Sequence, residues 1–514
     1  MCGITGVWGA PDGALMERLL VSLAHRGPDG QGAEQWARGS LGHCRLAIMD
    51  PAGGAQPIPN DDATWSISAN GEIYNFPTLR DELVTGHRWR TSSDSEAVLH
   101  LFEDHELATP ERLRGMFAFA LMSDDRLVLA RDPIGIKPLY VGSGTAADGR
   151  QVLAFASELT GLCEWADEVR EFPPGHIYDS RSGFHRYYRV PTPTPERRPV
   201  HEYVTLVREG LERAVSSHMM SDVPVGAFLS GGLDSSVIAA LARRHVGELH
   251  TFSVGTAASS DLRAARVVAE HIGSIHHEYV ITLDDVRRDL PDIVAHLESF
   301  DQDLVRSAIP THFCARLASQ YVKVILTGEG ADELFAGYRF HHEFDDFDAL
   351  HRELCRSVGT LHDINLQRAD RLTMRHGVEG RVPFLDTDFI DMALRIPADV
   401  KLPLGAPGRR TEKWVLRTAC ADLLPPEIVW RTKEQFDEGS GITDLVTASV
   451  ADLLADAAAR TRFDPVAYRT SAHEYLRSDE EALYHHLLTH RLSRPERLLA
   501  NVARWIDDRV PATS

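Results

Sequence analysis

Short apolar runs separated by turn-forming residues fill the first 190 residues of the chain. The runs at residues 65–69, 126–130 and 152–156 lie between clusters of Gly, Pro, Asn and Asp, which is typical of β-strands joined by turns. Residues 95–103 instead carry apolar side chains at helical spacing. Because strands and helices that bury one face pack in layers, this pattern predicts an α+β domain with packed sheets.

A proline-rich segment follows, and the pattern changes after it. Four prolines between residues 190 and 199 exclude regular helix and favour extended chain, so we predict a linker at residues 191–200. Beyond the linker the pattern is helical at 201–219, 235–245 and 261–272, β-rich at 250–255, and mostly helical after about residue 350. Strands that alternate with helices predict a doubly wound parallel sheet. The two predicted domains are therefore residues 1–190 and 201–514.

Composition narrows the class of protein. Of the 514 residues, 43% are hydrophobic and 25% are charged, as in ordinary globular proteins. The 75 acidic residues outnumber the 54 Lys and Arg and give a formal net charge of −21, which argues against a nucleic-acid partner, since phosphate backbones need clustered cations. A small basic pocket for ATP is compatible with that charge. No apolar run suits a transmembrane helix and no secretory leader is recognisable, so we expect a cytoplasmic protein without a membrane partner.

Cysteine usage singles out one residue. The six cysteines form no CxxC pair and have no zinc-ligand spacing with histidine, so we expect reduced thiols that are mostly small buried residues. Cys2 differs, because removal of Met1 would give it a free α-amine beside its thiol. An α-amine has a pKa of ~7.7–8.0 and can act as the base for its own thiol. Cys2 is therefore a candidate N-terminal nucleophile.

A glycine-rich loop gives the strongest local signal in the second half. Residues 229–236 are Leu-Ser-Gly-Gly-Leu-Asp-Ser-Ser and lie between an apolar run and a predicted helix. The glycines allow close approach of the backbone to a phosphate, and a helix N-terminus provides unpaired N–H groups. Asp234, as an anion, is predicted to hold Mg²⁺ that bridges phosphate oxygens. The loop resembles that of the ATP pyrophosphatases, which cleave ATP between its α and β phosphates.

Further motifs occur along the chain in a recognisable order. They are HRGPDG (25–30), NGEIYN (70–75), RDPIGIKPLY (131–140), TGEGADELFAGY (327–338), GVEGRVPFLD (377–386) and KEQF (433–436). With these motifs the first ~180 residues resemble a class II glutamine amidotransferase domain, and the rest resembles the synthetase domain of the asparagine synthetase B family. The resemblance implies an N-terminal nucleophile glutaminase with an αββα sandwich, followed by an α/β domain like that of the ATP pyrophosphatases.

The resemblance assigns roles in the first domain. Cys2 matches the nucleophile that attacks the side-chain amide of glutamine, forms a γ-glutamyl thioester and releases ammonia. Asn70 and Gly71 match the oxyanion hole, whose N–H groups stabilise the developing negative charge. The other implied glutamine contacts are Arg45 at the α-carboxylate, by bidentate pairing, and Glu72 and Asp94 near the α-amine.

The resemblance also assigns roles in the second domain. The implied ATP contacts are Leu229, Ser230, Gly231, Gly232, Leu233, Asp234, Ser235, Val254, Thr327 and Gly328. Asp234 and Asp332 resemble a carboxylate pair that brings Mg²⁺ to the pyrophosphate. Glu329 matches a residue that takes part in forming or using the acyl-adenylate, and Lys433 matches a lysine whose charge stabilises the departing pyrophosphate.

The segment implied to contact the second substrate departs from the family pattern. In asparagine synthetases it has roughly the form Asp-x-Thr-Thr-x-Arg-Ala-Ser-Thr, whereas residues 301–309 here are Asp-Gln-Asp-Leu-Val-Arg-Ser-Ala-Ile. Arg306 is retained and is predicted, with Glu329, to contact the second substrate. Asp303, Leu304 and Ile309 replace hydroxyl residues that could donate to a carboxylate. The acid that is activated is therefore L-aspartate or a related carboxylic acid of specialised metabolism.

The favoured interpretation is a glutamine-dependent amide ligase with ATP as substrate and Mg²⁺ as cofactor. It makes an acyl-adenylate, and ammonia travels inside the protein to attack it, because free ammonia is mostly protonated at pH 7. A ring-closing enzyme like β-lactam synthetase shares both domains but typically lacks the N-terminal cysteine. A non-catalytic homologue would lose Cys2, Asp234 or Asp332, and all three are present. Homodimers are usual in the resembled family, so a homodimer is the expectation by analogy.

Overall fold

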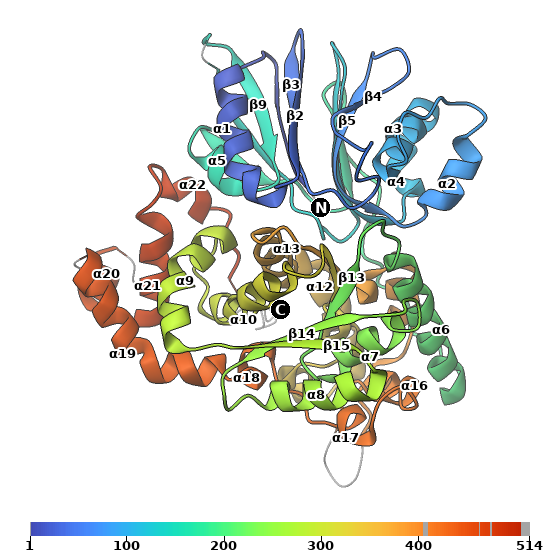
Figure 1. Cartoon of the computed structure of the whole chain (residues 1–514), viewed down its shortest axis with the longest axis vertical. Helices are drawn as coiled ribbons and strands as arrows, with labels where there is room; N and C mark the ends of the chain where they lie inside the picture. The colour runs from blue at the N-terminus through green and yellow to red at the C-terminus, as the bar shows by residue number, and fades with distance from the viewer. Residues whose placement is uncertain (1, 147, 405–409, 462, 473–474, 505–514) are drawn as a thin grey trace.

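Two bodies, one above the other in Figure 1, make up the computed structural model, which describes residues 2–146, 148–404, 410–461, 463–472 and 475–504. Residues 187–199 form no helix or strand and connect β12 (Gly183–Arg186) to α6 (Val200–His218). This stretch overlaps the predicted linker; the domain limits themselves stay a prediction. No helix among the described residues is both long enough and apolar enough to cross a membrane.

Two antiparallel sheets face each other in the upper body. One has the order β10 (Glu168–Glu171), β8 (Tyr140–Thr145), β9 (Gln151–Ala156), β1 (Gly3–Trp8), β3 (Gly39–Arg45), β2 (Gly30–Trp36). The other has the order β12, β11 (His176–Asp179), β7 (Leu127–Arg131), β6 (Gly115–Met122), β5 (Ser66–Ile73), β4 (Ile58–Pro59). Ile4 and Phe155 of the first sheet share a buried cluster with Ala118 and Leu129 of the second, because each strand presents an apolar face to the other sheet.

Helices cover the outer faces of both sheets. They are α1 (Gly13–Leu23) and α5 (Leu159–Cys163) beside the first sheet, and α2 (Phe76–Leu83), α3 (Asp94–His105) and α4 (Thr109–Arg112) beside the second, with the short turns η1 (Ala24–Arg26) and η2 (Glu106–Ala108). The layers are helix, sheet, sheet, helix, which confirms the predicted αββα sandwich. The runs expected at 65–69, 126–130 and 152–156 fall on β5, β7 and β9, and the helical run at 95–103 falls on α3.

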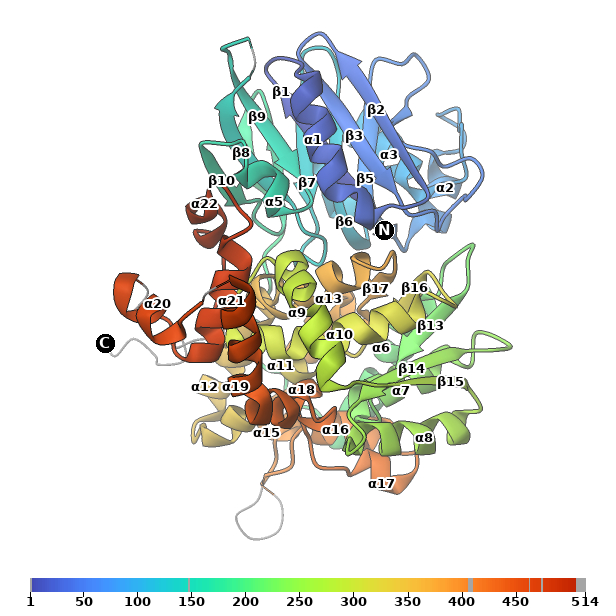
Figure 2. The ribbon, with the colours of Figure 1, turned by 60° about the vertical axis from the view of Figure 1, so that its left-hand side comes forward.

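A five-stranded parallel sheet forms the centre of the lower body, as predicted. Its order is β15 (Ile275–Val280), β14 (His250–Gly255), β13 (Val225–Phe228), β16 (Val324–Leu326), β17 (Glu379–Arg381). On one face lie α7 (Leu233–Ala242) and α8 (Ser260–Ile272), and on the other α9 (Leu283–Leu297), α10 (Gln302–Ala318) and α13 (Asn365–Met374) (Figures 1 and 2). Strand β17 lies in the part expected to be helical; its three residues contain no apolar run, and pairing with β16 defines it.

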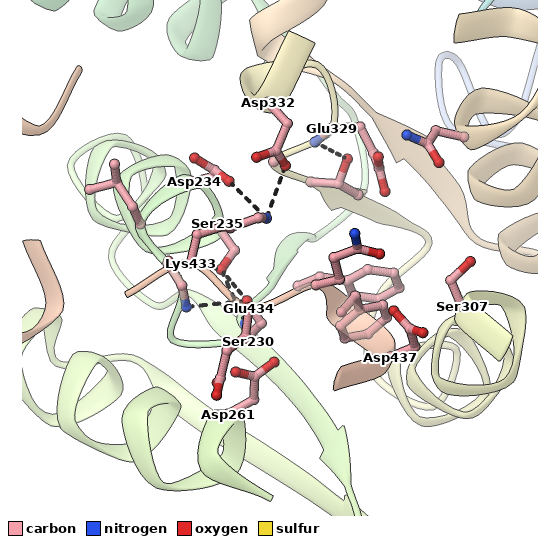
Figure 3. A pocket seen from close by; sticks show the side chains of 18 of the residues that line it. Ser230, Asp234, Ser235, Asp261, Ser307, Glu329, Asp332, Lys433, Glu434 and Asp437 are labelled. Atoms are coloured by element: carbon pink, nitrogen blue, oxygen red, sulfur yellow. Dashed lines mark hydrogen bonds and ion pairs between the residues drawn. The ribbon is translucent and has the colours of Figure 1, made fainter. Parts of the chain in front are cut away.

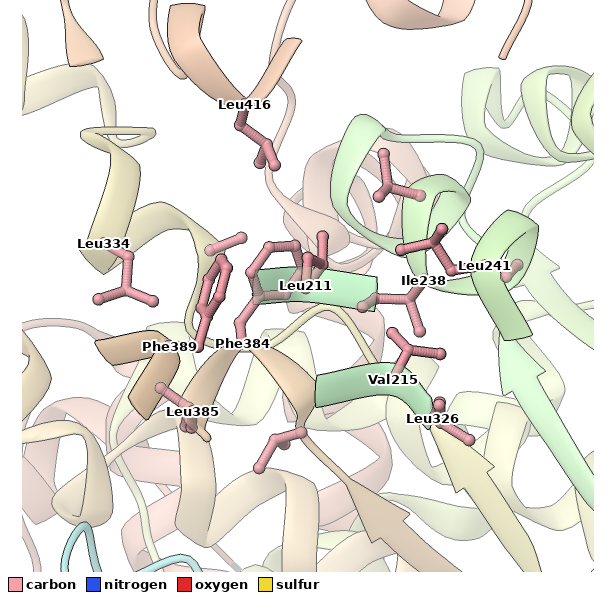
Figure 4. Close-up of a cluster of buried hydrophobic side chains, with 14 of the residues drawn as sticks. Leu211, Val215, Ile238, Leu241, Leu326, Leu334, Phe384, Leu385, Phe389 and Leu416 are labelled. Atoms are coloured by element: carbon pink, nitrogen blue, oxygen red, sulfur yellow. The ribbon is translucent and has the colours of Figure 1, made fainter. Parts of the chain in front are cut away.

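The remaining elements surround this sheet. They are α11 (Ala331–Phe335), η3 (Arg339–Glu343), α12 (Phe347–Gly359), η4 (Leu361–Asp363), η5 (Pro383–Leu385), α14 (Thr387–Leu394), α15 (Ala398–Lys401), α16 (Trp414–Ala419), α17 (Pro426–Val429), α18 (Phe436–Gly439), α19 (Ile442–Thr461), α20 (Pro465–Ala472), α21 (Asp479–Thr489) and α22 (Pro495–Leu499). Figure 4 shows how distant segments meet in one core: Leu211 of α6, Ile238 of α7, Leu326 of β16, Phe389 of α14 and Leu416 of α16. This core fixes the loops at the ends of the strands.

The parallel arrangement determines where a ligand can bind. Because β13, β14 and β16 run in the same direction, the loops that follow them meet at one edge of the sheet, where open α/β sheets bind their ligands. The loop after β13 contains Gly231 with φ +73°. A Cβ atom on Gly231 would lie 2.4 Å from the backbone nitrogen of Ala265, so only glycine allows the loop to pack against α8.

All six cysteines lie in described residues and are buried, free thiols. This confirms the expectation that these cysteines are mostly small buried residues.

Candidate active sites

Cys2 lies buried between the two sheets of the upper domain, immediately before β1. Its backbone nitrogen donates to Asn70 Oδ1 over 2.9 Å, and its Sγ lies 3.8 Å from the carbonyl oxygen of Leu46. Asn70 Nδ2 is buried and has no hydrogen-bond partner among the described residues. Asn70 therefore holds the nitrogen that becomes an α-amine when Met1 is removed, and keeps one donor available beside the thiol.

Gly71 follows Asn70 on β5 and has φ +151°. A Cβ atom there would lie 2.0 Å from the carbonyl oxygen of Met116, so the position accepts no side chain. Burial raises the pKa of the Cys2 thiol. A protonated thiol is a poor nucleophile, so this cysteine needs a base, which its own α-amine can provide.

The other predicted glutamine-binding residues lie around the same strand. Arg45 is held by loop carbonyls, with its guanidinium 2.6 Å from the oxygen of Asp50. Asp94 begins α3 and accepts a 2.7 Å hydrogen bond from the backbone nitrogen of Ile73 on β5, which ties it to the strand of Asn70. Burial raises the pKa of Asp94 to about 6. The carboxylate of Glu72 instead lies 3.5 Å from Arg381 of the lower domain.

A cavity of about 450 Å³ lies at the carboxyl edge of the parallel sheet. The predicted ATP-binding residues that line it are Leu229, Ser230, Gly232, Leu233, Asp234, Ser235, Val254, Thr327 and Gly328. Figure 3 shows Ser230, Asp234 and Ser235 facing this space from the loop and the start of α7. Ser235 Oγ accepts from the nitrogen of Ser230 over 3.1 Å and closes the loop. Gly231 is the one predicted contact outside the lining, because it packs under the loop against α8.

Two carboxylates and two ammonium groups meet in the cavity. Lys413 Nζ lies 2.5 Å from Asp234 and 2.7 Å from Asp332, and Lys433 Nζ lies 2.9 Å from Asp332 and 3.8 Å from Asp234. Burial disfavours the charge on Asp332, but the two lysines outweigh it and hold the pKa of Asp332 well below its usual range. Asp234 Oδ1 is buried with no hydrogen-bond partner among the described residues.

Lys413 is a site residue that sequence reasoning missed. It precedes α16 with φ +56°, an unusual conformation for a residue with a side chain, and it is almost fully buried. Gly337 makes room for it, because a Cβ atom on Gly337 would lie 2.1 Å from Lys413 Cε and 2.0 Å from Asp332 Oδ1. The only local signal is a lysine directly before an apolar helix, which is too common to mark a site.

The far end of the cavity contains a second polar group. Glu329 and Arg368, which both line the cavity, form an ion pair. Arg368 is buried and its Nε has no hydrogen-bond partner among the described residues. Asn365 also lines this end, and its Nδ2 donates to Tyr338 Oη over 3.0 Å. Sequence reasoning missed Arg368 and Asn365.

Arg306 does not lie where the sequence placed it. Its guanidinium pairs with Glu480 of α21, with Nε 2.8 Å from Oε1, and it is absent from the cavity lining. Asp303 and Leu304 do line the cavity, and Asp303 pairs with Arg477 over 3.0 Å. The cavity thus meets α10 through Asp303, Leu304, Ser307 and Cys314, and the retained arginine is not among them.

Helix α13 connects the two candidate sites. Arg26 of the upper domain donates to the carbonyl oxygen of Cys2 over 3.1 Å and pairs with Asp370 of α13 over 2.8 Å. Lys137, also from the upper domain, lies 3.4 Å from the second oxygen of Asp370. Arg368, two residues earlier on the same helix, lines the cavity. All these side chains are buried, so α13 joins the backbone of Cys2 to the wall of the cavity at the edge of the parallel sheet.

Comparison with known proteins agrees with this arrangement. The family model of the glutamine amidotransferase domain matches residues 1–221, and that of asparagine synthase matches residues 206–346 and 343–507. Asparagine synthetase [glutamine-hydrolyzing] 2 of Arabidopsis thaliana is 41% identical over 464 residues, covering 86% of this chain and 79% of its own length. Asparagine synthetase [glutamine-hydrolyzing] of Asparagus officinalis is 41% identical, covering 86% and 78%.

Among solved structures, an allosteric regulatory enzyme of purine biosynthesis matches with 19% identity and a TM-score of 0.32, covering 54% of this chain and 80% of its own, a likeness too weak to support an argument. The family models instead span both domains, and the relatives align over most of their length. The chain therefore belongs to the family of glutamine-hydrolysing asparagine synthetases.

Proposed function

We propose that this protein is a glutamine-dependent ligase that converts L-aspartate, ATP and glutamine to L-asparagine, AMP, pyrophosphate and glutamate. The observation that supports it most directly is the presence in one chain of a buried Cys2 held by Asn70 and a cavity of about 450 Å³ lined by most of the 229–235 loop. The relatives named above bear the name of this activity.

Glutamine hydrolysis would begin at Cys2. Its α-amine takes the thiol proton, and the thiolate attacks the side-chain carbonyl carbon of glutamine. The unpartnered Nδ2 of Asn70 and the N–H of Gly71 would donate to the oxyanion, which is the usual role of such preorganised donors. The protonated α-amine returns its proton to the amide nitrogen as the tetrahedral intermediate collapses, so that the C–N bond breaks and ammonia leaves; water then hydrolyses the thioester to glutamate and regenerates the thiol. Arg45 and Asp94 would hold the α-carboxylate and α-amine of glutamine.

The lower domain would activate the second substrate. A carboxylate oxygen attacks the α-phosphate of ATP, giving an acyl-adenylate and pyrophosphate, and ammonia from the upper domain then displaces AMP. Asp234 Oδ1 has no hydrogen-bond partner among the described residues and lies beside Asp332, which suits a hard divalent cation. These two residues would hold Mg²⁺, which would neutralise negative charge on the phosphates. Lys413 and Lys433 would also stabilise the pyrophosphate as it leaves.

The second candidate differs in the acid that is activated. Asp303 and Leu304 line the cavity at two positions where the family pattern has hydroxyl donors, and Ser307 is the hydroxyl residue that α10 still presents there; the two replacements favour a carboxylic acid other than L-aspartate. Pyrophosphate release separates the candidates. L-aspartate should stimulate it above the rate with ATP alone; stimulation by another carboxylic acid and none by L-aspartate would establish the alternative.

A separate experiment tests the proposal that the upper domain hydrolyses glutamine and the lower domain forms the amide. Cys2→Ala should abolish glutamine-dependent amide formation and leave the ammonia-dependent reaction intact. Cys163→Ala, which changes another buried thiol of the same domain, is the matched control and should leave both reactions intact. Loss of both reactions in Cys2→Ala would contradict the proposal.

The cellular setting follows from the thiols. Six free cysteines support a reducing compartment, and we place the protein in the cytoplasm. We also propose that the glutaminase occupies residues 1–190 and the synthetase residues 201–514, a division supported by the irregular stretch at 187–199.

A further inference from the structure

A cluster of metal-binding side chains lies on the outer helical layer of the upper domain, and neither proposed reaction uses it. Glu103 Oε2 lies 2.8 Å from Nδ1 of His100 and 3.1 Å from Nδ1 of His87. One ligand atom from each of the three side chains lies within 4.8 Å of the other two. His100 and Glu103 are three residues apart on α3 and share one face, and His87 comes from the segment before that helix.

The Nε2 atoms of the two histidines and the second carboxylate oxygen of Glu103, which point away from the cluster, also have polar neighbours. Nε2 of His87 lies 3.1 Å from Asp104, and Nε2 of His100 lies 3.4 Å from Glu96. The second oxygen of Glu103 accepts a 2.8 Å hydrogen bond from Asn60 Nδ2. Histidines that bind metals commonly face a carboxylate with their other nitrogen, which fixes the ring and raises its basicity. His87 has such a partner in Asp104, and His100 faces Glu96 at the longer distance of 3.4 Å.

We propose that His87, His100 and Glu103 bind a divalent transition-metal ion of the Zn²⁺ class, with solvent as the fourth ligand. Two imidazoles and one carboxylate are a donor set that suits zinc. Ligand atoms at about 2.0–2.1 Å from a tetrahedral ion lie about 3.3 Å apart, so the distances from Glu103 Oε2 to the two histidine nitrogens, 2.8 Å and 3.1 Å, need to open by only a few tenths of an ångström. Glu103 is 26% exposed, which provides both the freedom to move and the route for the ion.

The position of the cluster indicates what the ion would do. Glu96 accepts 2.7 Å hydrogen bonds from the backbone nitrogens of Arg90 and Thr91, so the segment between His87 and α3 is fastened to the helix at several points. Asp94 is the first residue of that helix. An ion that joins His87 to α3 would therefore fix the position of Asp94. This last step rests on the proposed function, in which Asp94 holds the α-amine of glutamine; the metal site itself does not.

Direct binding tests the site without turnover. The full chain is first made Cys2→Ala, so that the reactive thiol cannot bind the ion. Titration of the metal-free protein with Zn²⁺ in a calorimeter should show one equivalent, and Co²⁺ should give the visible absorption of a four-coordinate site. His87→Gln and Glu103→Gln should weaken Zn²⁺ binding at least tenfold. His105→Gln, at the end of the same helix, is the matched control and should bind as the parent does.

Two results would overturn the proposal. One is the absence of Zn²⁺ binding by the parent at micromolar concentrations, which would leave the cluster as ion pairs. The other is an equivalent of Zn²⁺ that persists in His87→Gln and Glu103→Gln, which would place the ion elsewhere. An unchanged near-ultraviolet circular dichroism spectrum, together with retained ammonia-dependent activity, shows that both domains of each variant are folded.

Glutamine binding to the Cys2→Ala protein tests the positioning role separately. Removing Zn²⁺ with a chelator should weaken glutamine binding several-fold in the parent and leave His87→Gln unaffected. Equal affinity with and without Zn²⁺ would refute the link to Asp94. Failure to bind glutamine under either condition would instead count against the proposed function, and the Zn²⁺ titration would still decide the metal site.

Discussion

Replacing Lys413 by methionine removes the ammonium group that lies between two buried carboxylates. The side chain of Lys413 is 1% exposed, and its Nζ is 2.5 Å from Asp234 and 2.7 Å from Asp332. Methionine has a similar length and fills the same space, so the change removes the charge and leaves the packing nearly intact. Asp234 and Asp332 are then left with Lys433, which contacts Asp332 over 2.9 Å.

The expected loss in the free energy of unfolding depends on the contacts that Asp234 and Asp332 keep. Breaking a buried ion pair by removing one partner costs about 3–5 kcal/mol, and the residual contact with Lys433 places this variant near the lower end, about 3 kcal/mol. The pKa of Asp332 is depressed in the folded protein, so its ion pairs stabilise the fold above about pH 4. This stabilisation is lost as the pH falls through the pKa of Asp332 in the folded state. In Lys413→Met the pKa of Asp332 rises, so a proton can replace the missing charge, and the stability difference should shrink from pH 8 to pH 5.

Urea unfolding at pH 8 and pH 5, with and without Mg²⁺, measures the effect. Mg²⁺ should raise the midpoint more in Lys413→Met than in the parent, because the cation takes the place of the ammonium between the carboxylates. Lys401→Met is the matched control. Lys401 is fully buried, its Nζ has no partner among the described residues, and burial lowers its pKa to about 7, so its replacement should be neutral or stabilising. If Lys413→Met lowers the free energy of unfolding by less than about 0.5 kcal/mol, or lowers it equally at both pH values, the reasoning is refuted.

Three further predictions concern the two sites. Asn70→Ala removes an oxyanion donor and should lower glutamate release about 10²–10³-fold with ammonia-dependent synthesis unchanged; a change below threefold would argue against that role. The pKa of Asp94, raised to about 6 by burial, means that the carboxyl is neutral below that pH, so KM for glutamine should rise as the pH falls through 6, and a flat profile would contradict it. Gly337→Ala places a Cβ 2.0 Å from Asp332 Oδ1 and should cut pyrophosphate release at least tenfold; normal release would show that the cavity adjusts.

Local features of the fold could be predicted from the sequence. Apolar runs between turn residues located β5, β7 and β9, a β-rich run located β14, and helical spacing located α3, α6, α7 and α8, because the apolar side chains of each are buried in the core. The loop at 229–235 could be found because its glycines and serines act within a few residues of each other. Strand β17 could not, since three residues that include two charged ones have no pattern of their own.

Contacts between distant segments could not be predicted in the same way. Lys413 meets Asp234 across 179 residues, and no local periodicity marks either partner for the other. Arg306 was expected at the substrate because its neighbours resemble a family motif, but Glu480, 174 residues later, holds its guanidinium. Arg368 belongs to a helix whose burial on all sides gives no indication of which side chain faces the cavity.

Helix α13 limits how the two halves of this chain can be recombined. Arg26 and Lys137 of the upper domain are buried and both approach Asp370 of the lower one. A chimaera that joined this upper domain to a synthetase lacking an acid at that point would leave Arg26 with Glu158 alone and would bury Lys137 without its ion-pair partner, at a cost of several kcal/mol. We therefore expect the two surfaces to change together: a substitution on one side should need its counterpart on the other.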